Sequence, residues 1–343
     1  MKRLLVICLG VLLGTLVTPA HATVYTFGSN AHSEGCLGHK GKEQTPKAVA
    51  LEGVVEVKAG YFSTYLRSST GLLYSCGGNA GGQAGQGIAR NAISALPGPV
   101  PLAGVQEVAI AGGDSHPLAL LNNGTVVQWG CPIEKKAECH TTPVPVPGLS
   151  GVVQVAHGGG ESYALLAAGT VTEWRSYEAP HLASGLRNIS AIAAGGVHEG
   201  TLYALLRDGT VKTIGAGKYG QRFTTSLRNI VQIASGGNWL EARDASGNVL
   251  TLGEDFAGAL GYQTSERCGK GAHVIPCSRV PRVILSGVSD IAAGTSFGLA
   301  VKAGKVYEWG RLGLKGASPI GVVKGLARIR SCAGDEHHLA CLS

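Results

Sequence analysis

The sequence is poor in charged and aromatic residues, which make up 15% and 6% of its 343 residues. It contains no block of Lys and Arg. Without Lys2 and Arg3, which belong to the leader described below, 27 basic and 22 acidic residues give a net charge of +5. A mild excess spread along the chain is not the footprint of a nucleic-acid-binding protein. The charge therefore predicts an ordinary surface and no nucleic-acid partner.

Long apolar runs are also lacking, with one exception at residues 4–17. This run follows Met1-Lys2-Arg3 and precedes Ala20-His-Ala22, an arrangement typical of a cleaved secretory signal peptide. A membrane anchor is the alternative, but the run is too short to span a bilayer comfortably. We expect a signal peptide at residues 1–22 and a secreted or periplasmic monomer, residues 23–343, that does not insert into a membrane.

Several motifs that identify enzymes are missing. The sequence has no Walker-type phosphate loop and no His-Glu-x-x-His metal motif. Its many Gly-x-Gly combinations fall where hairpins and strand ends are expected. We therefore predict a protein that is not an enzyme and that needs neither a cofactor nor a metal.

What the sequence does contain is 53 glycines, which punctuate a cassette that recurs seven times. Each copy has an apolar strand ending at Ala-Gly or Gly-Gly, a second apolar strand, a Gly turn and a third strand. The copies are residues 54–77, 105–130, 152–175, 189–215, 230–253, 288–310 and 329–343, and their first glycine anchors are Gly60, Gly112, Gly159, Gly195, Gly236, Gly294 and Gly334. Repeats at such intervals indicate a solenoid or a propeller. Because this many glycines would destabilise helices, we predict that the repeat is all-β.

The two ends of the chain complete each other. The seventh copy stops before its Gly turn and third strand, and the missing strand matches residues 23–28 at the start of the mature chain. Pairing of the two ends would close a ring and remove its exposed sheet edges. We therefore predict a single domain, a seven-bladed β-propeller whose last blade is closed by the N-terminal strand.

The cassettes resemble the repeat of the regulator-of-chromosome-condensation (RCC) family. The resemblance is carried by residues 111–120, by Trp129-Gly130, by residues 208–211 and 217–221, and by Trp309-Gly310. Some copies depart from the pattern: Phe297 replaces its usual histidine in the sixth, and Trp174-Arg175 replaces Trp-Gly in the third. The family includes exchange factors for small GTPases, an activity not carried over here, because export would remove the chain from cytosolic GTPases.

A closer resemblance is to exported bacterial propellers of this repeat, some of which inhibit secreted hydrolases such as β-lactamases. It implies a protein-binding scaffold whose rigid ring lowers the cost of association. The alternative is a carbohydrate-binding or hydrolytic propeller, in which aromatic rings stack on sugars and carboxylates act as acid and base.

Removal of the leader leaves eight cysteines, an even number that predicts disulfides in an oxidising compartment. Three pairs, Cys131 with Cys139, Cys268 with Cys277, and Cys332 with Cys341, each bracket one loop or hairpin. Cys36 and Cys76 are left for each other. A zinc site at Cys131, Cys139 and His140 is the alternative, but no further ligands complete it.

Candidate site residues follow the glycine anchors, because the corresponding turns of a propeller converge on one face. The polar candidates are Asp114, Glu161, His198, Glu199, Asp335, Glu336 and His338, whereas His116 and His337 occupy the family position of a structural histidine. The aromatic candidates are Tyr61, Phe62, Tyr163, Tyr219, Trp239, Phe256 and Phe297. Aromatic residues with a few charges are typical of protein-binding hot spots. The alternative places these rings between blades as structural wedges.

Overall fold

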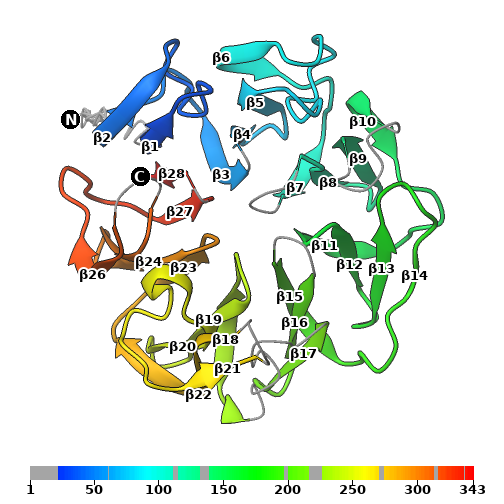
Figure 1. Cartoon of the computed structure of the whole chain (residues 1–343). Coiled ribbons are helices and arrows are strands. Elements are labelled where there is room, and N and C mark those ends of the chain that lie inside the picture. Colours follow the sequence, from blue (N-terminus) through cyan, green and yellow to red (C-terminus); the bar gives the residue numbers. More distant parts are fainter. Residues whose placement is uncertain are drawn as a thin grey trace, which may run out of the picture.

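In the computed structural model, seven antiparallel sheets stand in a ring around a central axis (Figure 1). The structure describes residues 22–60, 62–110, 115–131, 139–196, 200–215, 226–269, 274–312, 316–335 and 337–343. We number the sheets as blades 1 to 7 in chain order. Within the described ranges, no helix combines the length and the apolar character that a membrane crossing requires. The seven blades confirm the predicted seven-bladed β-propeller.

Blades 1 to 4 contain the strands of the first four cassettes, and each blade begins with the strand nearest the axis. Blade 1 has β3 (Val54–Gly60), β4 (Ser63–Ser68), β5 (Leu73–Gly78) and β6 (Ile93–Pro99), and blade 2 has β7 (Val105–Ala109), β8 (Leu118–Leu121), β9 (Val126–Gly130) and β10 (His140–Pro145). Blade 3 has β11 (Val152–Gly158), β12 (Glu161–Leu166), β13 (Val171–Arg175) and β14 (His181–Leu182), and blade 4 has β15 (Ile189–Gly195), β16 (Thr201–Leu206) and β17 (Val211–Gly215).

Blades 5 to 7 complete the ring. Blade 5 has β18 (Ile230–Ala234), β19 (Trp239–Asp244), β20 (Val249–Glu254), the short helix η2 (Phe256–Gly258), β21 (Arg267–Cys268) and β22 (Ile275–Leu285). Blade 6 has β23 (Asp290–Ala293), β24 (Phe297–Lys302), β25 (Lys305–Gly310) and β26 (Ser318–Val322). Blade 7 has β27 (Ser331–Gly334) and β28 (His338–Leu342) from the C-terminus, with β1 (Val24–Asn30) and β2 (Gly41–Ala48) from the N-terminus.

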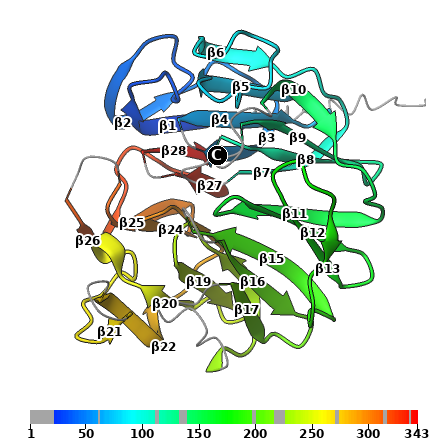
Figure 2. The same ribbon diagram turned by 45° about the vertical axis from the view of Figure 1, so that its right-hand side comes forward.

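Blade 7 closes the ring by pairing the two ends of the chain. Strand β1 lies antiparallel to β28, with Val24 opposite Leu342 and Phe27 opposite Leu339, and the two strands are neighbours in both views (Figures 1 and 2). The backbone N–H of Thr23 donates to Oγ of Ser343 at 2.9 Å. Residues 23–28 therefore supply the strand that the sequence predicted to be missing from the seventh cassette.

The cassettes predict three strands a blade, but in the described part of the chain six blades carry a fourth strand, and blade 5 adds a fifth. These strands, such as β6 and β10, fall in segments 84–103 and 131–150, which the sequence marks only as long Gly- and Pro-rich connections. Prolines within β2, β6, β10 and β26 are tolerated because an edge strand needs a ladder partner on one side only. Proline-rich composition therefore concealed edge strands here.

The core of the molecule lies between neighbouring blades, and tryptophan indoles span several of these junctions. Trp129 of blade 2 donates its Nε1–H to the carbonyl of Gln83 in the blade 1 loop at 2.8 Å. Trp309 of blade 6 donates to the carbonyl of Ala259 in blade 5 at 2.9 Å. Both indoles are fully buried, so they contribute apolar burial and a satisfied hydrogen bond at the same junction.

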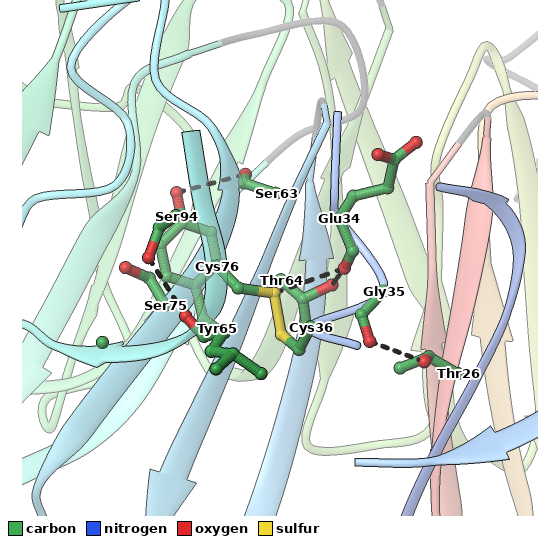
Figure 3. Close-up of a disulfide and its surroundings, with 12 residues drawn as sticks. Thr26, Glu34, Gly35, Cys36, Ser63, Thr64, Tyr65, Ser75, Cys76 and Ser94 are labelled. Atoms are coloured by element: carbon green, nitrogen blue, oxygen red, sulfur yellow. Dashed lines mark hydrogen bonds between the residues drawn. A yellow bond between two sulfur atoms is a disulfide. The ribbon is translucent and has the colours of Figure 1, made fainter. Parts of the chain in front are cut away.

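The four disulfides predicted from cysteine spacing are all present. Cys332 and Cys341 lie directly opposite each other on β27 and β28. Cys36, in the loop between β1 and β2 of blade 7, bonds Cys76 on β5 of blade 1 (Figure 3). This fourth bond therefore crosses from the closing blade to the first blade. The zinc alternative at Cys131 and Cys139 was wrong, because the two sulfurs bond each other.

Candidate functional site

The longest described loops of the propeller, such as 31–40 and 79–92, lie at one end, which we call the loop-rich face. The hairpin loops between the first and second strands of each blade lie there, together with the long loops that follow the third strands. The opposite end carries the tight turns between second and third strands, such as 69–72, and the connections between blades. The glycine anchors precede loops of the loop-rich face, so this is the end at which the sequence placed its candidate residues.

Three partly exposed rings from two blades meet on the loop-rich face, and we call them the aromatic platform: His32, Phe62 and His337. The ring of Phe62 lies 4.6 Å from that of His337 at an angle of 15°, which is a stacked arrangement. Its centroid is 4.1 Å from that of His32, tilted by 42°. Phe62 belongs to blade 1 and both histidines to blade 7, so the platform spans the junction where the ring closes.

A buried chain of hydrogen bonds joins the same two blades next to the platform. Nε2 of His338 is 2.6 Å from Oγ1 of Thr64. The Thr64 hydroxyl donates to the backbone carbonyl of Glu34 at 2.7 Å (Figure 3). Nδ1 of His338 lies 3.0 Å from Oδ1 of Asp335. The side chains of His338 and Asp335 are completely buried. This arrangement links β28, the β1–β2 loop and β4.

The carboxylates of this network also fix the backbone of the platform histidines. Oδ1 of Asp335 accepts the backbone N–H of His337 at 2.7 Å. Oε2 of Glu34 accepts the backbone N–H of His32 at 2.7 Å. Both platform histidines are therefore held by buried carboxylates, which preorganises the rings before any partner arrives.

The charges of His338 and Asp335 favour each other. Burial alone would raise the pKa of Asp335, but the charge of His338 and the hydrogen bonds that Asp335 accepts hold that pKa below its ordinary value. Burial alone would lower the pKa of His338, but the carboxylate of Asp335 raises it overall. A protonated imidazole donates from both nitrogens, which matches acceptors at Asp335 and at Thr64, whose own hydrogen points to Glu34.

A pocket of about 130 Å³ adjoins the platform and shares His337 with it. Its apolar lining includes Phe27 of β1 and Leu312 of the loop after β25, which are 5% and 8% exposed. Lys42 and Glu43 of β2 also line it. The pocket therefore combines an apolar lining with charged residues, at the junction of blades 6 and 7.

A larger cavity of about 410 Å³ follows the central axis, between the innermost strands. Polar side chains line this cavity. Two of them, at the same position of the innermost strand in neighbouring blades, form hydrogen bonds with the backbone of the next blade. Oε2 of Glu107 accepts the N–H of Val155 at 3.0 Å, and Gln154 bonds both the N–H and the carbonyl of Ile192. Burial raises the pKa of Glu107 to about 7. These residues join neighbouring blades, so the axial cavity has a structural use.

No family model matches the chain. The chain is 27% identical over 350 residues to the human Regulator of chromosome condensation, across 84% of the chain and 79% of that protein. It is 29% identical over 347 residues to the human E3 ubiquitin-protein ligase HERC2, across 86% of the chain and 7% of the ligase. The structure of Prp20p from Saccharomyces cerevisiae matches with a TM-score of 0.77 at 19% identity, across 94% of this chain and 91% of that one. Over most of its length, the chain is therefore similar to RCC-repeat β-propellers.

The chain spans only 7% of the length of the human and mouse HERC2 proteins and 34% of Protein pim1 from Schizosaccharomyces pombe. It therefore corresponds to one part of those proteins. The match to Prp20p, at 19% identity, concerns the fold.

Three of the predicted site residues lie on the loop-rich face of the propeller as expected. Phe62 is part of the aromatic platform. The carboxylate of Glu161, at the start of β12, accepts from Nε of Arg175 at 2.8 Å. Phe256, on η2, is 48% exposed, and the guanidinium of Arg311 lies 5.1 Å from its ring centroid.

Three aromatic candidates are buried, which contradicts their expected role on the surface and supports the alternative of rings wedged between blades. Trp239 is 1% exposed, and its Nε1–H donates to the carbonyls of Gly294 and Thr295 in blade 6, each at 3.3 Å. Phe297 is 1% exposed, with its ring against the backbone of Gly334 in blade 7. Tyr163 is 3% exposed in the core between blades 3 and 4. Large rings at these positions fill the wedge-shaped spaces between blades.

The roles expected for the two C-terminal histidines are exchanged. The pattern predicted a structural His337 and a surface His338 with Asp335, yet His338 and Asp335 are buried and His337 belongs to the platform. The loop from Gly334 to β28 is longer than the corresponding loop of blade 1, which shifts the inward-pointing position by one residue. Buried carboxylate and imidazole are tolerated there because they pair.

Six further candidates lie outside the described residues: Tyr61, Asp114, His198, Glu199, Tyr219 and Glu336. Among the residues that are described, no cluster of three or more His, Cys, Asp or Glu side chains could hold a metal.

Two features of the loop-rich face were not recognised from the sequence. Residues 294–298, Gly-Thr-Ser-Phe-Gly, match the Gly-x-Ser-x-Gly pattern of a nucleophile elbow. They form the hairpin between β23 and β24 rather than a strand-to-helix turn, and Ser296 is fully buried. The platform residue His32 was missed because it lies in a long loop after the closing strand, where no repeat pattern marks it.

Proposed function

We propose that the mature chain is an exported, non-catalytic scaffold that binds, and in doing so inhibits or recruits, a secreted or periplasmic protein through its loop-rich face. The aromatic platform carries this proposal. It presents His32, Phe62 and His337 in fixed positions on a rigid ring. Preorganised aromatic side chains lose little conformational freedom on binding, which is why protein interfaces are rich in them.

The comparisons support a protein as the class of partner. Prp20 of yeast has been solved in complex with Kap60, and its structure has been described together with its binding to Gsp1p and histones. Those partners belong to Prp20, because identities of 18% and 19% do not transfer a partner. What transfers to the proposal is that a propeller of this shape can serve as a protein-binding surface.

The disulfides support export. All eight cysteines that follow the leader are paired, and one disulfide connects blade 7 to blade 1. Such bonds form and persist in oxidising compartments. Together with the leader at residues 1–22, they favour a periplasmic or extracellular site of action.

The carbohydrate alternative loses two of its stacking rings, because Trp239 and Tyr163 are buried. Aromatic side chains stack on sugars only where a ring face is accessible. The exposed Phe256 already lies against Arg311. The described part of the loop-rich face therefore favours a protein ligand over a sugar.

The proposal is tested by immobilising residues 23–343 and capturing partners from the periplasm or secretome of its own host, with mass spectrometry as the readout. We expect one or a few exported proteins, retained less by a Phe62→Ala/Phe256→Ala variant. Leu72→Ala is the matched control, because Leu72 is 43% exposed in a turn at the opposite end. Equal retention by all three proteins, or binding only to glycans on an array, would contradict the proposal.

A further inference from the structure

The pocket beside the aromatic platform has the size of one side chain. Its volume of about 130 Å³ compares with the cavities left by deletion of a large apolar residue. Phe27 and Leu312 form its apolar part, and His337 connects it to the platform. Ala31, Gly41 and Lys42 also line it. A single apolar or aromatic side chain could enter, but a loop backbone could not.

The backbone around Phe62 is held in an unusual conformation that fixes the platform next to this pocket. Phe62 has φ = 55°, which is rare for a bulky residue and costs of order 1 kcal/mol or more. The opposing strand accommodates it only because residue 77 is glycine: a Cβ there would fall against the carbonyl oxygen of Phe62. Strain of this kind persists where the surrounding structure maintains it and is concentrated at functional sites.

One lysine lines the pocket, and two further basic residues directly adjoin lining residues in the sequence. Lys40 and Lys42 are exposed at the start of β2, and Arg311 precedes the lining residue Leu312. The one carboxylate of the lining, Glu43, lies 3.8 Å from His39. The whole sequence also carries an excess of basic residues. Charge complementarity therefore selects an acidic segment as the occupant.

We propose that this pocket takes one apolar or aromatic anchor residue from a surface loop of the protein partner, flanked by carboxylates that face Lys40 and Lys42. This inference rests on the proposed function and deepens it, since it names the chemistry by which the partner is recognised. The anchor side chain fills the space between Phe27 and Leu312 and touches His337. The acidic neighbours then lie on the basic rim, where electrostatic attraction also speeds association.

Three peptide probes separate the parts of the proposal: acetyl-Asp-Glu-Trp-Asp-Glu-amide, its Lys/Arg counterpart acetyl-Lys-Arg-Trp-Lys-Arg-amide, and the anchorless acetyl-Asp-Glu-Ala-Asp-Glu-amide. Each is titrated into isotope-labelled residues 23–343, with amide chemical shifts as the readout. We expect the first to shift Ala31, Gly41 and Lys42 with a Kd of about 0.1 to 3 mM. The other two should bind at least about fivefold more weakly.

Two substitutions on the same strand provide a matched pair. Lys42→Glu should weaken the first peptide at least about fivefold, whereas Lys47→Glu, the same charge change at the far end of β2, should leave it within about twofold. Ala31→Trp should weaken binding of the first peptide as much as Lys42→Glu does, because the new indole would enter the pocket from the exposed loop. Unchanged thermal melting of each variant shows that the fold is retained.

The pocket proposal would be overturned if all three peptides bound equally, or if Lys42→Glu and Lys47→Glu had equal effects. It would also be overturned if the first peptide did not bind at 10 mM, a concentration that corresponds to a binding free energy of about 3 kcal/mol. Concentration-dependent shifts of the same residues without peptide would mean that a second copy fills the pocket, and would also overturn it. If a captured partner binds Lys42→Glu and Ala31→Trp normally but loses affinity for Phe62→Ala/Phe256→Ala, the pocket proposal fails while the protein-binding function stands.

Discussion

Oγ1 of Thr64 lies 2.6 Å from Nε2 of His338, although 274 positions separate the two residues in the sequence. The contact joins the second strand of blade 1 to the last strand of the chain. Beside it, Cys36 and Cys76 join the same two blades covalently. The ring is therefore closed by strand pairing within blade 7. The junction of blades 7 and 1 is fastened by a buried polar network and by a disulfide, and it carries the aromatic platform on its surface.

The buried network should make stability depend on pH. The raised pKa of His338 contributes stability that is fully present below its ordinary value of 6.5 and is lost as pH rises through the folded-state value. The lowered pKa of Asp335 contributes stability that is present above 3.8 and is lost as pH falls through the folded-state value. His338→Gln should therefore cost most near pH 5 to 6, about 3 to 5 kcal/mol, because Asp335 is left buried and unpaired.

Urea unfolding of His338→Gln and the unchanged protein at pH 5.5 and pH 9 checks this prediction. The double variant His338→Gln/Asp335→Asn should lose less than the two single variants combined. A cost that is identical at both pH values would show that His338 is not charged in the folded protein.

The disulfide between blades should contribute more than the local ones. In the chain-entropy description, a separation of 40 residues between Cys36 and Cys76 corresponds to about 4 kcal/mol, and a separation of 9 between Cys268 and Cys277 to about 2.5 kcal/mol. Replacing each pair by alanine and measuring urea unfolding tests the order. A larger loss for Cys268/Cys277 would indicate that the junction of blades 7 and 1 is not the element that limits stability.

Glu107 should make the free energy of unfolding fall as pH rises. Its pKa of about 7 exceeds the ordinary 4.5, so the folded protein binds this proton more tightly than the unfolded chain and loses stability between pH 4.5 and 7. Glu107→Gln should raise the free energy of unfolding by about 1 to 3 kcal/mol at pH 8 and by little at pH 4.5. The amide oxygen can still accept the N–H of Val155, as Gln154 does for Ile192.

The reverse change, Gln154→Glu, is the control, and it should reduce stability at pH 8 more than at pH 4.5. Thermal unfolding across this range measures both variants. A Glu107→Gln effect that is the same at every pH would contradict the assignment of a raised pKa to Glu107.

Trp239 should contribute strongly to stability, whereas Phe256 should contribute little. Trp239→Ala removes a buried indole between blades 5 and 6 and should cost about 3 to 5 kcal/mol. Phe256→Ala removes a half-exposed ring and should cost less than about 1 kcal/mol. Chemical denaturation gives both values, and a stable Trp239→Ala variant would contradict the wedge role.

The sequence predicted the ring, its closure and the four disulfides because these follow from local and repeated signals. Glycine turns, apolar strands and cysteine spacing recur in each cassette, so every copy supports the others. The pairing of residues 23–28 with β28 could be predicted because the seventh copy visibly lacked a strand.

The site could be predicted only in part. Burial of Trp239 and Phe297 depends on the width of the space between two blades, which no single cassette records. The exchange of roles between His337 and His338 depends on the length of one hairpin loop. The pocket combines Phe27, Leu312 and His337 from three distant segments, so only closure of the ring brings them together.

We expect the loop-rich face to bind a protein. The most direct test measures the affinity of the captured partner for residues 23–343 and for two variants, Phe62→Ala/Phe256→Ala on that face and Leu72→Ala on the opposite end, by surface plasmon resonance. We expect a loss of affinity of at least about tenfold for the first variant, or about 1.4 kcal/mol, and a change within about twofold for the second. Equal affinities, or a larger loss for Leu72→Ala, would contradict it.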